Sequence, residues 1–434
     1  MAYTQIMRWI MHLDMNSFFA TVEQQANPFL RGRAIGVAGR PGSRSIVAAA
    51  SIEAKRGGIK TAMGTAEALA TDPTLRLVVG NNQRYQAVSR QVIAIALRYT
   101  PDVEVFSIDE CFLDLTAIVN DWQQAANIAC GIKAAIRTEI GEYITCSVGV
   151  ARNKFLAKLA SDLFKPDGLH LVADDVSAVV VQVPTMRASR TRLLISQTDA
   201  LLLKTPPPEF CGLGPRLARH LARIGIVTTA DLRAADVGLL RRILGVVGQQ
   251  LYDYAWGRDS RPVRCLLDVP LPQSFSHAIT LPVTDYTPAA ARSYLSGLAE
   301  KAAFQMRNRG MAARQVSCFV RFGMHSGWGG HTTLHYPVRD GQMIFTLAET
   351  IFSRCRSWQP IRLIGVALRS VQPVSELTAP LLLDDQKTER IINALDLINN
   401  RFGAGTAVPA RTLLSKGRQS EATHAFGFTS QQHY

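Results

Sequence analysis

The sequence predicts a multidomain protein of the α/β (α+β) class, and three observations support this prediction. The chain has 434 residues, which is too long for one ordinary core and implies about two to four domains. Hydrophobic residues make up 47% and charged residues 19%, as in globular rather than disordered proteins. Strand-like apolar runs alternate with amphipathic helical stretches in the first and last thirds, and a stretch without strand patterns lies between them.

The N-terminal third is expected to form an α/β layer. Its strands follow β-type apolar runs, and its helices follow apolar residues at helical spacing. Between two of the long helices, residues 103–116 have two β-type halves and predict a hairpin. The other expected elements, in chain order, are a strand and a helix within 1–25, two strands within 31–50, a short helix at 51–58, helices at 84–100 and 121–140, a strand at 143–151 and a helix at 153–164.

The pattern changes after the α/β layer. Residues 174–203 are expected to be irregular, and the proline-rich KTPPPEF at 204–210 to form a rigid hinge. Residues 209–260 look all-helical, and the proline-bearing segment 260–277 is expected to link two domains. Strands and helices alternate again over 277–402, and the polar residues after them are expected to be loosely ordered.

The chain is strongly basic. Its formal net charge of +14 favours a polyanionic partner, nucleic acid ahead of an anionic membrane, although a merely basic enzyme is the alternative. No apolar run approaches the roughly 20 residues that span a bilayer, and the N-terminus has no secretion signal. The seven cysteines are scattered without a CxxC pair, so no disulfide framework or zinc site is indicated, and a cytoplasmic location is expected.

Two adjacent acids, Asp109 and Glu110, lie between apolar residues in FSIDECFLDL (106–115). In a hairpin, the apolar flanks would be buried while the turn lifts the acids to the sheet edge. Two carboxylates so close repel each other unless a cation offsets them, and Mg²⁺ prefers such hard oxygen ligands. Asp14 ends the first expected strand. If that strand pairs beside the hairpin, the three carboxylates converge in an arrangement suited to two metals roughly 3.5–4 Å apart for in-line phosphoryl transfer.

The same acids also have a purely structural interpretation. Asp109 and Glu110 are common turn residues, and Asp14 would be a suitable N-cap for the following helix. Spacing alone leaves both interpretations open.

Five separated motifs of the chain resemble those of one enzyme family. They are LDMNSFFATVE (13–23), SIEAKRGGIKTAM (51–63), FSIDECFLDL (106–115), SVGVARNKFLAKLASDLFKPDGL (147–169) and CGLGPRLARHLARIGI (211–226). In this order, over about residues 9–410, the chain resembles the Y-family translesion DNA polymerases, and among them most closely the bacterial DNA polymerase IV (DinB) group. Because several separated motifs agree, the resemblance does not depend on any one of them.

The resemblance implies a right-hand polymerase with palm, small fingers, helical thumb and C-terminal little finger. It implies low-fidelity, template-directed translesion synthesis, and the chain has no room for a separate proofreading domain. The expected domains are the palm at 1–25 and 85–173, the fingers at 26–84, the thumb with helix-hairpin-helix elements at 174–262, a linker at 263–275, the little finger at 276–405 and a tail at 406–434.

The resemblance also implies a set of metal ligands. These are the carboxylates of Asp14, Asp109 and Glu110, together with the backbone carbonyl of Met15. Two Mg²⁺ ions, with Mn²⁺ as a substitute, would serve the attack of the primer 3′-hydroxyl on the α-phosphate of a dNTP. These three carboxylates are the same ones that are expected to converge at the edge of the sheet if the hairpin pairs beside the first strand.

Two aromatic residues are expected at the nucleotide site. Phe19 falls at the family's steric-gate position, where its ring would collide with a ribose 2′-hydroxyl. Phe18 is its neighbour in sequence, and at least one of two adjacent helical aromatics is expected to be buried in a core. The alternative for Phe19 is therefore an ordinary core aromatic.

Lys55 and Lys158 are expected to contact the triphosphate, with solvated helix lysines as the alternative. Here the chain departs from the family pattern. Ile52 and Lys55 stand where Tyr and Arg are usual, and Ala49 stands where a small hydroxyl residue is common. Lys55 keeps the charge but lacks the planar fork of arginine, and the other two changes remove hydroxyl groups. The result is fewer hydrogen bonds to the triphosphate, about 0.5–1.5 kcal/mol each, which predicts weak nucleotide affinity, a raised KM or an altered choice of substrate.

Glycine-bracketed turns and arginines are expected to bind DNA. Two turns, at Gly212 and Gly214 and at Gly245 and Gly248, resemble helix-hairpin-helix elements whose backbone N–H groups point at a phosphate, with simple helix C-caps as the alternative. For any one arginine, a solvated charged face is the alternative to a backbone contact. The little-finger arginines expected to follow the duplex are Arg307, Arg309, Arg314 and Arg321.

The expected partners are primer–template DNA and a dNTP, bound by a monomeric bacterial enzyme of the cytoplasm and nucleoid without membrane association. A sliding clamp is a further candidate, but the tail ATHAFGFTSQQHY has no clear copy of the glutamine-leucine-phenylalanine clamp-binding peptide. One alternative function is a non-catalytic DNA-binding scaffold in lesion bypass, which the altered triphosphate pocket favours and the intact acids oppose. Another is a palm-fold nucleotide cyclase, in which the helical hairpins and the basic C-terminal domain would have no role.

Overall fold

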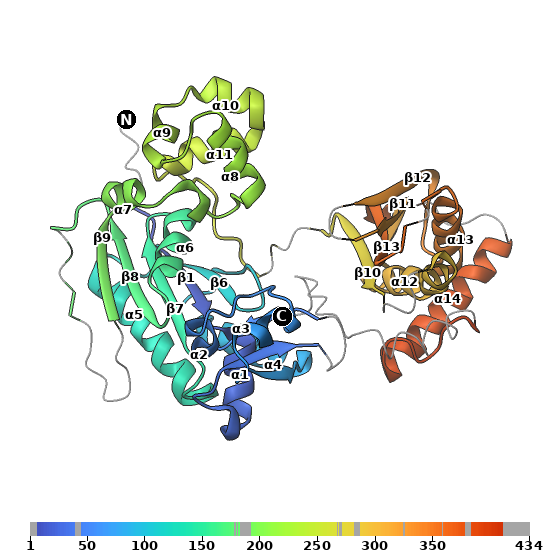
Figure 1. Ribbon diagram of the computed structural model, residues 1–434, viewed down its shortest axis with the longest axis horizontal. Helices are drawn as coiled ribbons and strands as arrows, with labels where there is room; N and C mark the ends of the chain where they lie inside the picture. Colours follow the sequence, from blue (N-terminus) through green and yellow to red (C-terminus); the bar gives the residue numbers. More distant parts are fainter. Residues whose placement is uncertain are drawn as a thin grey trace. The chain divides into compact units, whose positions relative to one another are not determined.

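The computed structural model consists of two compact units, one formed by residues 7–38 and 45–268 and the other by residues 271–410. Both combine sheets with helices (Figure 1). Within the described part of the chain, no helix is long and apolar enough to cross a membrane. The residues described are 7–39, 45–177, 179, 181–182, 192–266, 268, 271–281, 287–323, 326–357, 359–377 and 383–410.

The first unit is built on a six-stranded sheet. Strand β1 is antiparallel to both of its neighbours, β6 and β7. Strands β5 and β6 pair antiparallel, so the hairpin predicted for residues 103–116 is confirmed. In sheet order the strands are β5 (Val103–Val105), β6 (Glu110–Asp114), β1 (Ile10–Met15), β7 (Cys146–Ala151), β8 (Gly168–Ala173) and β9 (Arg192–Gln197).

Helix α6 (Lys154–Leu163) packs directly on β1 and β7. Gly149 of β7 permits this approach, because a Cβ at this position would lie only 2.1 Å from the backbone oxygen of Ala157. The helix covers the face of β1 that carries His12, whose Nδ1 lies 2.7 Å from the Ser161 hydroxyl. Asp14 shares that face because side chains alternate along a strand. The sheet therefore brings the end of β1 next to α6.

A three-stranded sheet in the order β3-β2-β4 forms a second layer of the same unit. Strand β2 (Ile35–Ala38) is antiparallel to β3 (Ala49–Ala50) and parallel to β4 (Arg76–Val79), which confirms the two strands predicted within 31–50. Ser51 caps the short helix α2 (Ile52–Arg56) by accepting a hydrogen bond from the Ala54 N–H. Helix α3 (Thr65–Thr71) follows, and Ala54 and Ala68 contribute to the small core of this layer.

The segment that follows β8 differs from the prediction. The sequence predicts irregular structure over 174–203, and this prediction is wrong for residues 192–203. Strand β9 pairs in parallel with β8 at the edge of the six-stranded sheet, and α7 (Thr198–Lys204) follows at once. The pairing with β8 is a tertiary contact, which outweighs weak local propensity in a strand. Residues 183–191 of this segment lie outside the described residues.

Residues 209–260 form short helices, as predicted. They pack on α6 through a shared apolar core, in which the rings of Phe155 and Tyr254 stack with centroids 4.0 Å apart. This core ties the helical cluster to the six-stranded sheet within one unit. The helices are α8 (Pro215–Arg223), α9 (Thr229–Ala234), α10 (Val237–Leu244) and α11 (Val246–Ala255), preceded by the 3₁₀ turn η3 (Pro207–Glu209).

The second unit has an antiparallel four-stranded sheet in the order β10-β13-β11-β12. Alternate residues of β11 and β13 join helices α12 and α13 in one core, which leaves the other face of the sheet open. Helix α14 follows the sheet in sequence. The elements are β10 (Ser274–Thr280), α12 (Pro288–Asn308), β11 (Met311–Arg321), β12 (Gly327–Val338), α13 (Gly341–Phe352), β13 (Leu363–Pro373) and α14 (Leu383–Phe402).

Candidate active site

Strands β1 and β6 place three acids at one edge of the six-stranded sheet. Asp14 pairs in register with Glu110, the first residue of β6. The N–H of Met15 donates to the backbone oxygen of Asp109 at 2.9 Å, so Asp109 lies beside the end of β1. Asp14 is a strand residue and not a helix cap, because the N-cap of α1 (Phe18–Ala26) is Ser17.

A cavity of about 480 Å³ opens at this edge. Its aromatic part is formed by Phe18 and Phe19. One side, which we call the acidic floor, consists of Asp14, Met15, Asp109 and Lys165. The opposite side, which we call the β3–α2 wall, consists of Ala49, Ile52, Lys55 and Arg56. Of the residues that the sequence predicts for metal and nucleotide, the structure therefore gathers six around one cavity, Asp14, Met15, Phe18, Phe19, Lys55 and Asp109.

Glu110 and Lys158, by contrast, are not among the residues that line this cavity. The Glu110 carboxylate pairs with the Lys158 ammonium and accepts a hydrogen bond from His12 Nε2 at 3.1 Å. Burial raises the pKa of Glu110, but the His12 hydrogen bond and the Lys158 charge outweigh burial and hold that pKa at about 2. Glu110 is therefore ionised, and its charge is matched by a neighbouring lysine.

Asp14 and Asp109 are in a different electrostatic state. Burial raises the pKa of both, and the Glu110 charge raises that of Asp109 further. Lys165 offsets part of this effect at Asp14, because its Nζ lies 2.9 Å from Asp14 Oδ1, although it also lies 2.7 Å from Asp162. Asp109 accepts a hydrogen bond from the Ser107 hydroxyl. The charged forms of Asp14 and Asp109 are thus less well stabilised by their surroundings than that of Glu110.

The donor set of the floor fits a hard divalent cation. Mg²⁺ takes oxygen ligands, and the floor offers the carboxylates of Asp14 and Asp109 with the backbone carbonyl of Met15. Among the described residues, no group of three or more histidine, cysteine, aspartate or glutamate side chains is arranged to hold a metal ion. At this site the Glu110 carboxylate pairs with Lys158 and does not line the cavity with Asp14 and Asp109.

Phe18 and Phe19 are neighbours on α1 but have different environments. The Phe18 side chain is in the core, 3% exposed. The half-buried Phe19 ring stacks on Tyr85 of α4 (Asn82–Ala96), with centroids 4.5 Å apart and planes 22° from parallel. Tyr85 is itself fixed, because it is buried and its hydroxyl donates to Glu23 at 2.7 Å. The ring at the cavity surface with a rigid support is therefore that of Phe19.

In the β3–α2 wall, only Lys55 and Arg56 have polar side chains. Ala49 and Ile52 contribute only carbon atoms from their side chains, and Lys55 contributes one ammonium group. Burial of that ammonium and the nearby charge of Lys165 lower the pKa of Lys55, and the floor acids only partly reverse this shift. Within the described residues the Lys55 side chain has no hydrogen-bond or ion-pair partner, so it is available to an anionic ligand.

Lys165 and Arg56 line the cavity, although neither was predicted from the sequence as a site residue. Lys165 lies directly before Pro166, Asp167 and Gly168, at the turn between α6 and β8. The sequence did contain a signal for Lys165, which is a cation next to a turn at the start of a strand. Turn residues at such a position bring a side chain to the edge of the sheet.

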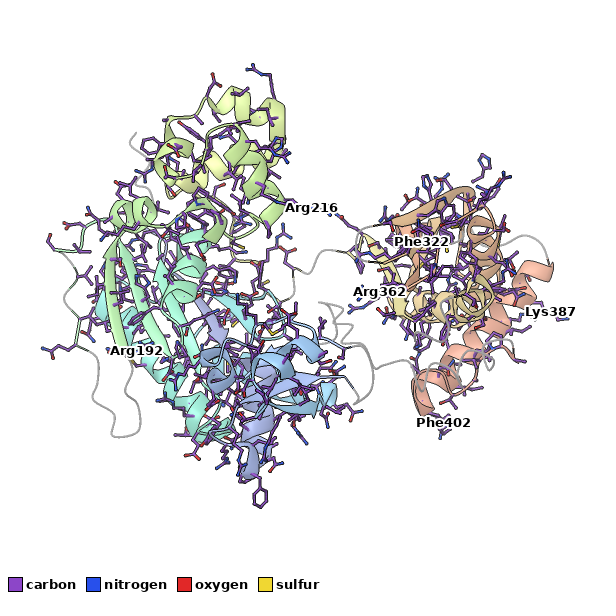
Figure 2. The ribbon with its side chains drawn as sticks, in the orientation of Figure 1. Arg192, Arg216, Phe322, Arg362, Lys387 and Phe402 are labelled. Atoms are coloured by element: carbon purple, nitrogen blue, oxygen red, sulfur yellow. The ribbon has the colours of Figure 1, made fainter. Side chains whose placement is uncertain are left out.

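The predicted DNA-binding glycines lie in turns of the helical cluster. Gly212 and Gly245 have the left-handed φ values +88° and +63°, and Gly214 is the N-cap of α8. A Cβ at any of these three positions would meet no atom within 4 Å, so the turns are open to a ligand's approach. Gly248 differs, because it is buried where α11 packs closely on the backbone of α10. Figure 2 shows Arg216 extending from the same cluster.

Arg309, Arg314 and Arg321 are exposed on the second unit, whereas Arg307 is buried. The Arg307 side chain is 2% exposed, and its guanidinium pairs with Asp396 at 2.7 Å and with Glu300 at 2.8 Å. This arginine therefore joins α12 to α14 inside the unit. We exclude it from the predicted DNA contacts, because a saturated, buried guanidinium cannot follow a phosphate backbone.

The comparisons with known proteins agree over most of the chain. Models described as the impB/mucB/samB family and its C-terminal domain match residues 13–162 and 272–380. A DNA polymerase IV of Desulfatibacillum aliphaticivorans is 32% identical, over 92% of this chain and 96% of the relative. The chain belongs to the impB/mucB/samB family. A second DNA polymerase IV, from Xanthomonas oryzae pv. oryzae, is 39% identical over 85% of this chain and 96% of the relative. The predicted membership of the Y family, in the DNA polymerase IV group, is confirmed.

Solved structures of the family confirm the fold. A chimera of the Y-family DNA polymerases Dbh and Dpo4 aligns with a TM-score of 0.69 at 24% identity, covering 84% of this chain and 99% of that chain. An insertion ternary complex of the Dbh DNA polymerase aligns with a TM-score of 0.53 over the same shares. The predicted multidomain α/β polymerase fold with a C-terminal domain is therefore correct.

Proposed function

We propose that this chain is a template-directed DNA polymerase of low fidelity, which adds dNTPs to a primer 3′-hydroxyl during translesion synthesis and does not proofread. Family membership supports the DNA polymerase activity. The observation that carries the finer proposal is the cavity, where two undercompensated carboxylates, a rigidly backed aromatic ring and three cationic side chains meet. Small residues at its edge, such as Ala48 and Thr61, leave room for an altered base pair.

Asp14, Asp109 and the Met15 carbonyl are the proposed ligands of two Mg²⁺ ions, or of Mn²⁺, and Glu110 joins them after leaving Lys158. Bound divalent ions at this position lower the pKa of the primer hydroxyl and offset charge on the triphosphate. The protein keeps the carboxylates in place by burying the strands that carry them, Leu13 and Cys111 among their residues. Preorganised charge of this kind needs little rearrangement during the reaction.

The remaining cavity residues recognise the nucleotide. The Phe19 ring, supported by Tyr85, excludes a ribose 2′-hydroxyl and so selects dNTPs. Lys55, Arg56 and Lys165 are the proposed triphosphate contacts because all three line the cavity. Lys158 remains a predicted contact that reaches the triphosphate only by releasing Glu110.

The proposed DNA contacts lie in both units. In the helical cluster, the open turns at Gly212, Gly214 and Gly245 allow a DNA phosphate to approach the backbone. In the second unit, the open face of the sheet carries small or polar side chains in register. Ser276, Ala367, Ser317 and His331 form one such row across the four strands. Exposed Arg309, Arg314 and Arg321 supply charge, which makes binding depend on salt.

The proposal also includes the domain limits, the oligomeric state and the cellular location of the protein. We retain the palm, fingers, thumb and little-finger limits predicted from the sequence, with β9 as an addition to the sheet of the palm. We also retain a monomer acting in the cytoplasm at the nucleoid. The tail ATHAFGFTSQQHY, residues 422–434, lies outside the described residues, so a contact with a sliding clamp stays a prediction.

Two observations favour the scaffold alternative. Glu110 is paired with Lys158 instead of facing the cavity, and the β3–α2 wall offers few hydrogen bonds. A scaffold would bind primer–template DNA without extending it. The cyclase alternative is not favoured, because it leaves the helical cluster and the second unit without a role.

Primer extension tests the proposal. The purified full-length chain is assayed on undamaged and damaged templates, with Mg²⁺ and either dNTPs or rNTPs. The proposal expects extension with dNTPs on both templates, and strongly reduced extension with rNTPs. DNA binding without extension on either template would favour the scaffold instead.

A further inference from the structure

A buried lysine holds the loop that carries Lys165. Lys133 of α5 (Trp122–Ala135) is only 2% exposed. Its ammonium donates to the Cys146 backbone oxygen at 2.6 Å, to the Asp167 backbone oxygen at 3.1 Å and to Asp167 Oδ1 at 2.6 Å. These contacts use all the donors of the ammonium group. Arg137, four residues later, pairs with the other carboxylate oxygen of Asp167.

Asp167 connects this pair of cations to the acidic floor. Its φ of +59° lies in the left-handed region, which a non-glycine residue adopts only when neighbouring contacts hold it there. Its N–H donates to Asn16 Oδ1 at 2.7 Å, and the amide of Asn16 donates to the Ser147 hydroxyl at 2.9 Å. Asn16 directly follows Met15. Asp167 is thus bound directly to Lys133 of α5 and to Asn16 after β1, and each of these two partners is in turn bound to β7.

Lys165 lies two residues before this anchor. Its side chain is 38% exposed, so burial alone does not fix its position, yet its Nζ lies 2.9 Å from Asp14 in the cavity. A long, flexible lysine loses its rotamer freedom when it binds a ligand. Asp14 and Asp162 hold the ammonium at its tip, and the loop backbone sets the position from which the side chain extends.

We propose that Lys133, together with Arg137, is a positioning residue for nucleotide binding: it fixes Asp167 and thereby places the Lys165 ammonium where the triphosphate of the incoming nucleotide binds. Lys133 does not itself line the cavity. This inference rests on the proposed function of the cavity. The competing explanation is that Lys133 only stabilises the fold.

Steady-state primer extension distinguishes the two explanations. Lys133→Met keeps the length of the side chain and removes the ammonium. We expect KM for the dNTP to rise about 10-fold while kcat stays within about threefold, because a displaced contact weakens binding of the nucleotide. Lys165→Ala should raise KM at least as much. In the double variant Lys133→Met/Lys165→Ala, KM should rise no further than in Lys165→Ala, since Lys133 acts through Lys165.

Lys154 provides a matched control. It is a second buried lysine of the same unit, with Nζ 2.6 and 2.7 Å from the two carboxylate oxygens of Glu104, and neither residue lines the cavity. Lys154→Met removes a comparable ion pair, and we expect it to lower thermal stability without changing KM. If Lys154→Met raises KM as Lys133→Met does, or if the effects of Lys133→Met and Lys165→Ala on KM simply multiply, the positioning role is wrong.

A binding measurement separates this inference from the proposed function. Titration calorimetry of dATP into the protein with a dideoxy-terminated primer–template and Mg²⁺ gives Kd without turnover. We expect a Kd about 10-fold weaker for Lys133→Met. A wild-type chain that neither binds dATP nor extends a primer would contradict the proposed function. An active wild type whose Kd and KM are unchanged by Lys133→Met would contradict only the positioning role. If Lys133→Met fails to fold, Arg137→Gln, at a less buried site, takes its place, and the same increases in Kd and KM are expected.

Discussion

The two sides of the cavity are built differently. The acids of the floor lie at the end of β1 and directly before β6, two strands whose central residues, such as Leu13 and Cys111, are fully buried, and Lys165 and Ser107 contact these acids. The β3–α2 wall stands on a two-residue strand and a five-residue helix, and the Lys55 side chain has no partner within the described residues. A floor fixed by a core tolerates little change, whereas a wall on short local elements can change its side chains without disturbing the fold. We therefore expect the floor to determine whether chemistry occurs and the wall to determine how tightly the substrate binds.

The largest expected effect comes from the floor. Asp109→Asn removes the charge of a proposed metal ligand at nearly constant shape. We expect kcat for primer extension to fall by about 10³-fold, which corresponds to about 4 kcal/mol of transition-state stabilisation. Asp102→Asn, at an exposed position directly before the same hairpin, is the control and should leave kcat unchanged. If Asp109→Asn extends primers at a near-normal rate, the acidic floor does not take part in the reaction.

The aromatic part of the cavity comes next in size. Phe19→Ala should raise the efficiency of rNTP incorporation relative to dNTP by about 10²-fold, because the ring that excludes the 2′-hydroxyl is gone. Competitive primer extension with matched dNTP and rNTP measures the ratio. Phe29→Ala changes a phenylalanine that is 79% exposed in the same unit and should leave the ratio unchanged. An unaltered ratio in Phe19→Ala would count against the gate.

The wall should have smaller effects, and in the opposite direction. Ile52→Tyr with Lys55→Arg restores a hydroxyl and a planar fork, each adding about 0.5–1.5 kcal/mol of hydrogen bonding to the triphosphate. We expect KM for the dNTP to fall by about 5-fold or more with little change in kcat, because the two contributions sum to at least about 1 kcal/mol. Lys60→Arg, an exposed change nearby, is the control. A KM that does not respond to the double change would mean that the wall does not bind the triphosphate.

The difference between floor and wall also explains what the sequence alone could predict. The apolar flanks of FSIDECFLDL indicate a hairpin, and a hairpin beside the first strand brings Asp14, Asp109 and Glu110 to one edge. Sequence periodicity contains that information. The direction of the Glu110 side chain depends instead on His12 and Lys158, which come from distant parts of the sequence. A local sequence pattern cannot predict a side-chain direction that depends on such tertiary contacts.

The same limit applies elsewhere in the chain. Strand β9 is stabilised by its pairing with β8, so the irregular local pattern of its segment is misleading. Arg307 resembles any surface arginine in sequence, and only the fold brings Asp396 and Glu300 to it. Asp167, two residues after Lys165, is anchored from α5 by a contact between residues 34 positions apart, which no local pattern indicates.

The smallest expected effect is on stability, and it tests whether the floor is built for function. The raised pKa of Asp109 means that the folded state binds its proton more tightly than the unfolded state, so this group destabilises the fold increasingly as pH rises from 3.8 through the folded value. Glu110 has a lowered pKa of about 2, so it contributes stability that is present above 4.5 and lost as pH falls toward 2. At neutral pH the two neighbouring acids should therefore act in opposite directions.

Thermal unfolding with EDTA at pH 7.5 measures the sign of each contribution. Asp109→Asn should raise Tm by about 2 °C, because it removes a buried charge that the protein does not fully neutralise, whereas Glu110→Gln should lower Tm by a similar amount, because it leaves Lys158 without its partner. At pH 3.5 the gain from Asp109→Asn should disappear, since the wild-type carboxyl is then protonated. If both substitutions lower Tm, Asp109 is held by contacts as favourable as those of Glu110, and the floor carries no uncompensated charge for a cation to neutralise.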